Sequence, residues 1–177
     1  PPLGERARVR GQSAKTFGNR SKGRASMSST HVLRTSQWVP LPPTEVFPFF
    51  ADIANLERIT PPELRFYLLT PGPIIMQVGT LLEFRLQLCR VPFKWLTRIR
   101  QWQPPHEFLD EQLRGPYRLW LHTHRFRAEN GGTRLEDEVL YNLPFFPLGE
   151  LAHPLVRWQL DRIFAFRRRV IARLLGS

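Results

Sequence analysis

A succession of short β-rich runs, each closed by turn residues, is the feature that most constrains the fold of this chain. Pro, Gly or Asn stands in nearly every connection between the runs, as expected for turns. Because short connections join antiparallel rather than parallel neighbours, the runs predict an antiparallel meander, with one turn at residues 91–92. The predicted strands are 31–39, 64–70, 79–90, 93–103, 107–113, 117–127 and 133–143.

Helical periodicity replaces the strand pattern in two places. Apolar residues have helical spacing over 44–52 and 53–59, between the first two predicted strands. The C-terminal 30 residues carry an apolar stripe with arginines off it, which predicts a long amphipathic helix with Pro154 at a bend or in its first turns. The stripe consists of Leu160, Ile163, Phe164, Val170, Ile171, Leu174 and Leu175.

Together these elements predict an α+β fold. A curved, seven-stranded antiparallel sheet wraps around the long C-terminal helix, and two short helices follow the first strand. Because the sheet needs cover on one face, we expect the apolar stripe of the helix to lie on the sheet rather than on a membrane surface. A curved sheet of this kind leaves a cavity beneath the helix, and such cavities commonly hold apolar ligands.

Positive charge is concentrated at the N-terminus. The chain has a net charge of +11, and residues 1–30 hold seven basic residues against one acidic residue. This segment is rich in Gly, Ser and Arg, so we predict a disordered basic tail over 1–30 and one folded domain over 31–177. Three interpretations of the tail stay open: a nucleic-acid-binding arm, a transit-type leader, or coding sequence upstream of Met27.

The sequence also excludes several classes of protein. No run of about 18 consecutive apolar residues occurs, so no membrane-spanning helix is expected. Cys89 is the single cysteine, which excludes an internal disulfide and favours a reducing compartment such as the cytoplasm. The GxGxxG, P-loop, GxSxG and HExxH motifs are absent, so we predict no cofactor and no metal.

Two histidines share one face of the predicted strand 117–127. The period of two in a strand places His122 and His124 on this face together with Trp120 and Phe126. In the following strand Asp137 shares a face with Tyr141.

A carboxylate is therefore expected beside the histidines. A short connection with two glycines makes the two strands neighbours, which places Asp137 near His122 and His124. Glu111, from the preceding strand, is expected close by.

Three interpretations of this polar group stay open. Buried polar groups usually satisfy one another, so the first is a hydrogen-bond network that lines a pocket and meets the polar head of a ligand. The second is acid–base catalysis, in which His122 or His124 takes a proton from an enolisable ligand and Asp137 or Glu111 orients the ring. The third is a metal site of two histidines and one carboxylate, for which H-x-H on a strand is a weak signal.

Two further strands contribute candidate pocket walls. Phe84 alternates with polar residues in step with Leu86 and Leu88, which predicts an apolar inner face. Unpaired arginine is rarely buried, so the cationic face of the next strand is expected to meet solvent. In that strand the predicted inner face holds Trp95, Thr97, Ile99 and Gln101, and the opposite face holds Lys94, Arg98, Arg100 and Trp102.

Three segments resemble the SRPBCC superfamily of START-like helix-grip proteins, which are often described as polyketide cyclase/dehydrase or lipid-transport domains. They are FFADIANLERITPPEL at 49–64, FKWLTRIRQWQPPHEFLDEQLRGPYRLWLHTHRF at 93–126 and GGTRLEDEVLYNLP at 131–144. The middle segment, with DEQ followed by GPY and W.H.H.F, is the most specific, and the resemblance extends over about 31–175. It implies a helix-grip fold with a ligand cavity.

The resemblance and the residues together lead to three hypotheses of function. The first is binding of a small, mainly hydrophobic, lipid- or polyketide-like molecule between the sheet and the C-terminal helix. The second is a cyclase or dehydratase that uses His122 or His124 with a carboxylate. The third is peripheral binding of nucleic acid or anionic membrane through the basic tail and residues 167–169. The residues predicted to contact a ligand are Phe84, Trp95, Trp120, His122, His124, Phe126, Asp137 and Tyr141.

Overall fold

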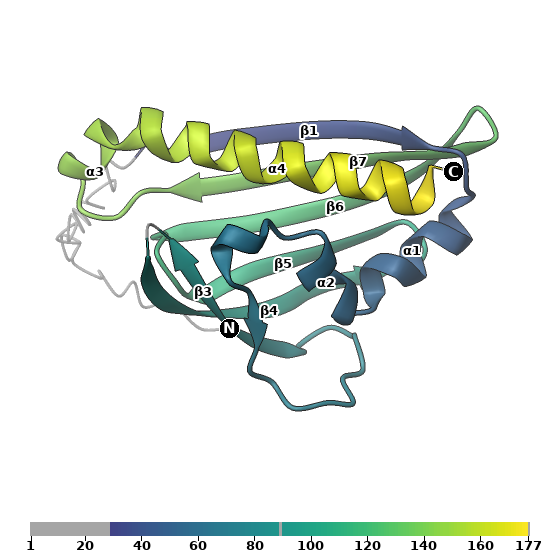
Figure 1. Ribbon diagram of the computed structural model, residues 1–177, viewed down its shortest axis with the longest axis horizontal. Coiled ribbons are helices and arrows are strands. Elements are labelled where there is room, and N and C mark those ends of the chain that lie inside the picture. Colours follow the sequence, from purple (N-terminus) through teal and green to yellow (C-terminus); the bar gives the residue numbers. More distant parts are fainter. Residues whose placement is uncertain (1–28, 89, 177) are drawn as a thin grey trace, which may run out of the picture.

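The computed structural model describes residues 29–88 and 90–176 and contains the antiparallel sheet that the sequence predicts (Figure 1). The predictions for Cys89 and for all but the last two residues of the tail lie outside the described residues. The strands are β1 (His31–Val39), β2 (Tyr67–Leu68), β3 (Leu81–Leu88), β4 (Val91–Gln103), β5 (Glu107–Arg114), β6 (Leu119–Glu129) and β7 (Gly132–Asn142). The helices are α1 (Pro43–Ala51), α2 (Ala54–Arg58), the 3-10 helix η1 (Pro62–Leu64), α3 (Leu148–Leu151) and α4 (His153–Leu175).

One seven-stranded sheet has the strand order β1-β7-β6-β5-β4-β3-β2. Strands β2 to β7 form a meander, and β1 lies at one edge of the sheet, where it pairs with β7. In this last pair Leu33 lies opposite Val139, and both side chains are fully buried. The predicted α+β helix-grip fold is confirmed, including the two short helices after the first strand.

The prediction of a strand over 64–70 is largely wrong. Only the two residues of β2 pair with β3. The preceding residues form η1, and Arg65 has a left-handed backbone with a φ of 42°. Because this conformation turns the chain, the extended segment starts only after Arg65.

The turn predicted at 91–92 lies earlier in the chain. Arg90 has a φ of 66°, which provides a tight reversal between β3 and β4. Val91 already pairs with Leu88, and Pro92 pairs with Gln87. Both predicted turn residues therefore belong to β4.

A register shift in β4 exchanges two side chains between the faces of the sheet. The β4–β5 pairing slips between Ile99 and Gln101, as in a β-bulge, where one strand carries an extra residue. Trp102 consequently points inward and lies 5.0 Å from the ring of Phe47. Gln101 points outward, and its Nε2 donates to Glu107 Oε1 over 2.8 Å. The faces predicted for Gln101 and Trp102 are therefore reversed.

Helix α4 runs across one face of the sheet, and its C-terminal end lies beside α1 (Figure 1). The predicted apolar stripe is confirmed, with Leu160, Phe164 and Ile171 buried. Pro154 lies in the first turn of α4, where its missing N–H is tolerated. Within the described ranges, no helix combines the length and hydropathy that crossing a membrane requires.

Two apolar clusters hold α4 on the sheet. Ile171 packs with residues of α1 and with Phe126 at one end. Phe164 packs with Leu33, Val139 and Trp120 toward the other end. The inward-facing side of the helix between these two clusters therefore lies over the middle of the sheet.

Replacing Phe47 by Ala tests the first cluster. Phe47 is 4% exposed and contacts the rings of Trp102, Phe108 and Phe126. We expect Phe47→Ala to lower the free energy of unfolding by about 3–5 kcal/mol, measured by urea denaturation. The control Phe145→Ala, at a site 83% exposed, is expected to change it by less than about 0.5 kcal/mol. Equal effects of the two variants contradict this description of the core.

Candidate functional site

A cavity of about 230 Å³ lies between α4, the helices α1 and α2, and the inner face of β3 to β6. Most of its wall is apolar, and a group of polar side chains occupies one part of it. The apolar wall includes Phe50, Ile53, Leu56, Leu82, Phe84, Leu86, Trp95, Ile99, Trp120, Leu160, Ile163 and Phe164.

The residues predicted to contact a ligand divide into two groups. Those on the inner face of β3, β4 and the middle of β6 line the cavity, whereas the others are covered by neighbouring helices or strands. Phe84, Trp95, Trp120, His122 and His124 belong to the first group, and Phe126, Asp137 and Tyr141 to the second.

Helix packing explains why two aromatic residues are kept from the cavity. Phe126 is 2% exposed, and its ring lies 5.2 Å from Phe47 and 5.1 Å from Phe50. Tyr141 is fully buried, and its hydroxyl lies 3.2 Å from His153 Nε2 at the start of α4. Strand periodicity places both side chains on the correct face, but the helices decide what each of them meets.

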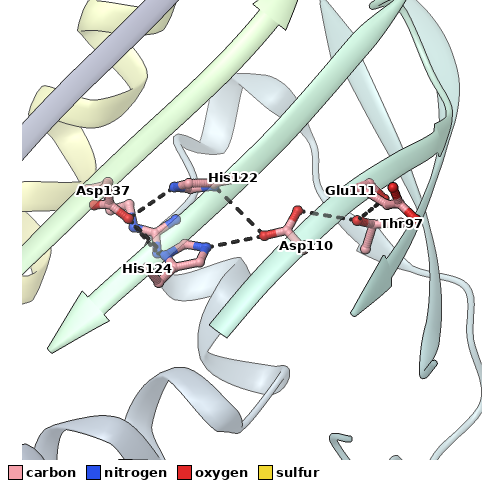
Figure 2. A network of polar contacts seen from close by, with 7 residues as sticks. Thr97, Asp110, Glu111, His122, His124 and Asp137 are labelled. Carbon is pink, nitrogen blue, oxygen red and sulfur yellow. Dashed lines mark hydrogen bonds and ion pairs between the residues drawn. The ribbon is translucent and has the colours of Figure 1, made fainter. Parts of the chain in front are cut away.

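The strand register brings two aspartates to the two histidines. Asp110 of β5 lies opposite His122 of β6, and Asp137 of β7 lies opposite His124. Because β6 stands between β5 and β7, the imidazole rings are held between the two carboxylates (Figure 2). The rings themselves are tilted by 40° with centroids 3.7 Å apart.

Each imidazole faces both carboxylates. Asp137 Oδ1 is 3.0 Å from His122 Nε2 and 2.8 Å from His124 Nδ1. Asp110 Oδ2 is 3.2 Å from His124 Nε2 and 3.9 Å from His122 Nδ1. The contacts to Asp137 are therefore shorter for both rings.

Two further side chains complete the cluster. Arg167 of α4 has an exposed fraction of only 11%, and its NH2 group lies 3.5 Å from His124 Nδ1 and 3.9 Å from Asp137 Oδ1. Within the described part of the chain, Arg167 Nε has no hydrogen-bond partner. Thr97 Oγ1 lies 3.2 Å from Asp110 Oδ1 and donates to the backbone oxygen of Glu111 over 2.8 Å.

The surroundings keep both aspartates ionised. Burial raises the pKa of Asp137, but the Arg167 guanidinium and the hydrogen bonds from the histidines outweigh burial and hold this pKa well below its ordinary value. Burial likewise raises the pKa of Asp110, and the hydrogen bond from His124 with the charges of both histidines lowers it overall.

His122 is neutral near pH 7. Burial lowers its pKa to about 4, the neighbouring His124 acts in the same direction, and Asp137 and Asp110 oppose the shift only in part. A neutral imidazole with one nitrogen bonded to Asp137 keeps a lone pair on the other nitrogen. His122 therefore presents a proton acceptor or metal ligand at the cavity wall.

Glu111 does not join this cluster, contrary to the sequence prediction. It lies on the outer face of β5, where its carboxylate accepts hydrogen bonds from Arg98 Nε at 2.7 Å and Arg100 at 3.3 Å. Alternation along β5 turns the neighbouring Asp110 inward instead.

Sequence reasoning missed Asp110 and Arg167. Asp110 lies two residues after Phe108 in β5, so both side chains lie on the same face of the strand. The apolar Phe108 is the signal that this face is the inner one. Arg167 lies three residues after Phe164 and four before Ile171, a spacing that places it within the apolar stripe of α4.

The inward position of Arg167 also corrects the predicted basic surface over 167–169. Arg168 and Arg169 are exposed, whereas Arg167 is engaged with the site. Only two of the three arginines are therefore available to an external polyanion.

The family model described as polyketide cyclase/dehydrase and lipid transport matches residues 39–166. The chain belongs to this family. The match includes every residue that lines the cavity except Arg167, and it confirms the SRPBCC assignment. No curated protein sequence matches this family member at a significant level.

Solved structures share the fold of this polyketide cyclase/dehydrase family member. Protein Ms6760 from Mycobacterium smegmatis is 17% identical, with a TM-score of 0.59, and the match covers 81% of this chain and 90% of that one. TTHA0849 from Thermus thermophilus is 18% identical, with a TM-score of 0.61 and coverage of 81% and 99%. The di-domain ARO/CYC BexL from the BE-7585A biosynthetic pathway is 18% identical, with a TM-score of 0.61 and coverage of 84% and 50%.

The low pKa of His122 predicts a specific loss of stability in mild acid. In the unfolded chain this histidine binds a proton at its ordinary pKa of about 6.5, whereas in the folded protein it does so only near pH 4. Stability is therefore lost as pH falls from 6.5 toward 4, by roughly 2.5 kcal/mol at pH 4.5. Urea denaturation across this range is expected to show a smaller loss for His122→Gln than for the wild type.

His106→Gln is the matched control, because His106 is exposed. It is expected to keep the pH dependence of the wild type. If His122→Gln keeps it as well, His122 is protonated in the folded protein and the description of its environment is wrong.

Proposed function

We propose that this protein binds a small, mainly apolar, lipid- or polyketide-like molecule in the cavity between the sheet and α4. The observation that carries the proposal is a cavity with a largely apolar wall and one buried polar part, formed by Asp110, His122, His124 and Arg167. Ligand pockets commonly combine an apolar wall with a few polar groups that fix orientation. The family description, which includes cyclases and lipid transport, supports the same conclusion.

The size of the cavity limits the ligand. Its volume of about 230 Å³ lies slightly below the roughly 300–1,000 Å³ of pockets for drug-sized molecules. A compact ring system or a short chain suits this space better than a complete two-chain lipid. The polar end of the molecule is expected at the His122–His124 wall, since apolar groups gain more by contacting the opposite side.

Filling the cavity tests this proposal. Leu86 lines the cavity, whereas Leu113 lies near the end of β5, is 46% exposed and does not line it. We expect Leu86→Trp to weaken binding of the apolar fluorophore N-phenyl-1-naphthylamine at least about tenfold, because the indole occupies the space of the ligand. Leu113→Trp is the matched control and is expected to bind as the wild type does.

The readout is the fluorescence increase of the probe on titration with protein, with far-UV circular dichroism to verify folding. Equal affinity of the two variants places the probe outside the cavity and contradicts the proposal. Absence of any binding by the wild type contradicts it as well.

Proton transfer within the same cavity is a second candidate function. The neutral His122 favours it, because this residue lines the cavity, its Nε2 is bonded to Asp137 and its Nδ1 lies 3.9 Å from Asp110. A base oriented by a carboxylate is suited to remove a proton next to a carbonyl group. The similarity to an ARO/CYC protein of a biosynthetic pathway supports this chemistry.

The enolisable ketone 1-tetralone provides a direct probe of this second function. We expect the wild type to accelerate exchange of its α-hydrogen in D₂O, followed by NMR, and His122→Gln to reduce the acceleration about 100-fold. His106→Gln is expected to leave it unchanged. An exchange rate with wild-type protein that equals the rate in buffer contradicts base catalysis on this probe. It does not affect the binding proposal, which the N-phenyl-1-naphthylamine titration tests separately.

A further inference from the structure

Three ligand-type side chains converge at the polar wall of the cavity. One ligand atom each of Asp110, His122 and His124 lies within 4.8 Å of the other two. The two nitrogens nearest to Asp110 Oδ2 are His124 Nε2, at 3.2 Å, and His122 Nδ1, at 3.9 Å. All three residues line the cavity.

Asp137 determines which nitrogens carry hydrogen. A carboxylate only accepts hydrogen bonds, so the contacts of 3.0 Å and 2.8 Å to Asp137 require protons on His122 Nε2 and His124 Nδ1. In a neutral imidazole the other nitrogen then has a lone pair. The other two nitrogens, His122 Nδ1 and His124 Nε2, both lie toward Asp110 Oδ2, which His124 Nε2 contacts in a hydrogen bond of 3.2 Å.

A metal ion between these three atoms takes the place of the proton shared by His124 Nε2 and Asp110 Oδ2, because metal ligands bind in their deprotonated form. A proton bridges only one nitrogen–carboxylate pair, whereas a metal ion contacts both nitrogens and the oxygen together. Metal–ligand bonds of about 2.0–2.1 Å in a tetrahedral arrangement place neighbouring ligand atoms roughly 3.3 Å apart. The separations of 3.2 Å and 3.9 Å to Asp110 Oδ2 are close to this value, and the two nitrogens lie within 4.8 Å of each other.

Neighbouring residues hold the three side chains in place by hydrogen bonds, as is usual around metal ligands in proteins. Histidine ligands in proteins usually donate their second N–H to a carboxylate, which is the position of Asp137. Thr97 Oγ1 lies 3.2 Å from Asp110 Oδ1 and leaves Oδ2 directed at the histidines. Arg167 pairs with Asp137 at 3.9 Å, whereas among the described residues the ion pairs of Asp110 are with the two histidines alone, so the cluster accommodates further positive charge.

We propose that Asp110, His122 and His124 form a site for one divalent first-row transition metal ion, with the remaining coordination positions open to the cavity. Two imidazoles and one carboxylate favour Zn²⁺ or Fe²⁺ over Mg²⁺ or Ca²⁺, which prefer all-oxygen ligands. Asp137, which the sequence suggested as the carboxylate near the histidines, acts as a positioning residue. The inference goes beyond the proposed ligand binding, because the metal ion binds without the apolar molecule.

The test is titration of the full chain, prepared without a polyhistidine tag, with Co²⁺ as a spectroscopic substitute for Zn²⁺. We expect one equivalent of Co²⁺ to give the visible absorption of a low-coordinate site and Zn²⁺ to displace it, with no effect of Mg²⁺. Asp110→Asn and His124→Gln are expected to weaken Co²⁺ binding more than about 100-fold. Asp137→Asn is expected to weaken it about 10–100-fold, because it leaves the ligands in place but unsupported.

His106→Gln is the matched histidine control and is expected to bind Co²⁺ as the wild type does. Each variant is checked by circular dichroism and by binding of N-phenyl-1-naphthylamine, which reports the cavity independently of the metal. Folded wild type that binds the fluorophore but no Co²⁺ or Zn²⁺ overturns the metal site and leaves the ligand proposal intact. Co²⁺ binding that survives in both Asp110→Asn and His124→Gln also overturns it.

Discussion

The burial of charge beneath α4 is the constraint on which the rest of the structure depends. Phe164 and Ile171 anchor the helix in two apolar clusters, and Arg167 lies between them. Once the helix is seated, this guanidinium needs a carboxylate, and Asp137 provides it. Removing one partner of a buried ion pair leaves an uncompensated charge, which costs about 3–5 kcal/mol. The packing of the helix and the geometry of the site therefore stabilise each other.

Asp137 connects the buried Arg167 to the histidines of the cavity wall, because its carboxylate contacts both. By accepting from both imidazoles it orients the rings so that His122 Nδ1 and His124 Nε2 lie toward Asp110. The apolar wall around them keeps the local dielectric low, so charges and hydrogen bonds act more strongly than in water. The proposed ligand binding, proton transfer and metal binding all use these cavity-lining residues.

Local patterns were sufficient for most of the fold. Alternation and turn residues predicted the inner faces of β3 and β6, and the apolar stripe predicted the seating of α4. The errors arise where a single residue changes the period. A left-handed Arg65 shortens β2, and the slip in β4 exchanges Gln101 and Trp102. Such changes depend on pairing with a neighbouring strand, which a sequence pattern does not contain.

The sequence by itself determined that His122 and His124 share an apolar face, because the side-chain period of a strand is fixed by backbone geometry. It also determined that a carboxylate from the next strand lies beside them, since a short turn sets the register of a hairpin. Alternation in step with Phe108 already favours Asp110 over Glu111 on the inner face, but the tertiary structure sets how close Asp110 comes to the histidines and brings Arg167 to them from 43 residues away. Those partners come from separate elements, and their distances are fixed by how the helix packs on the curved sheet.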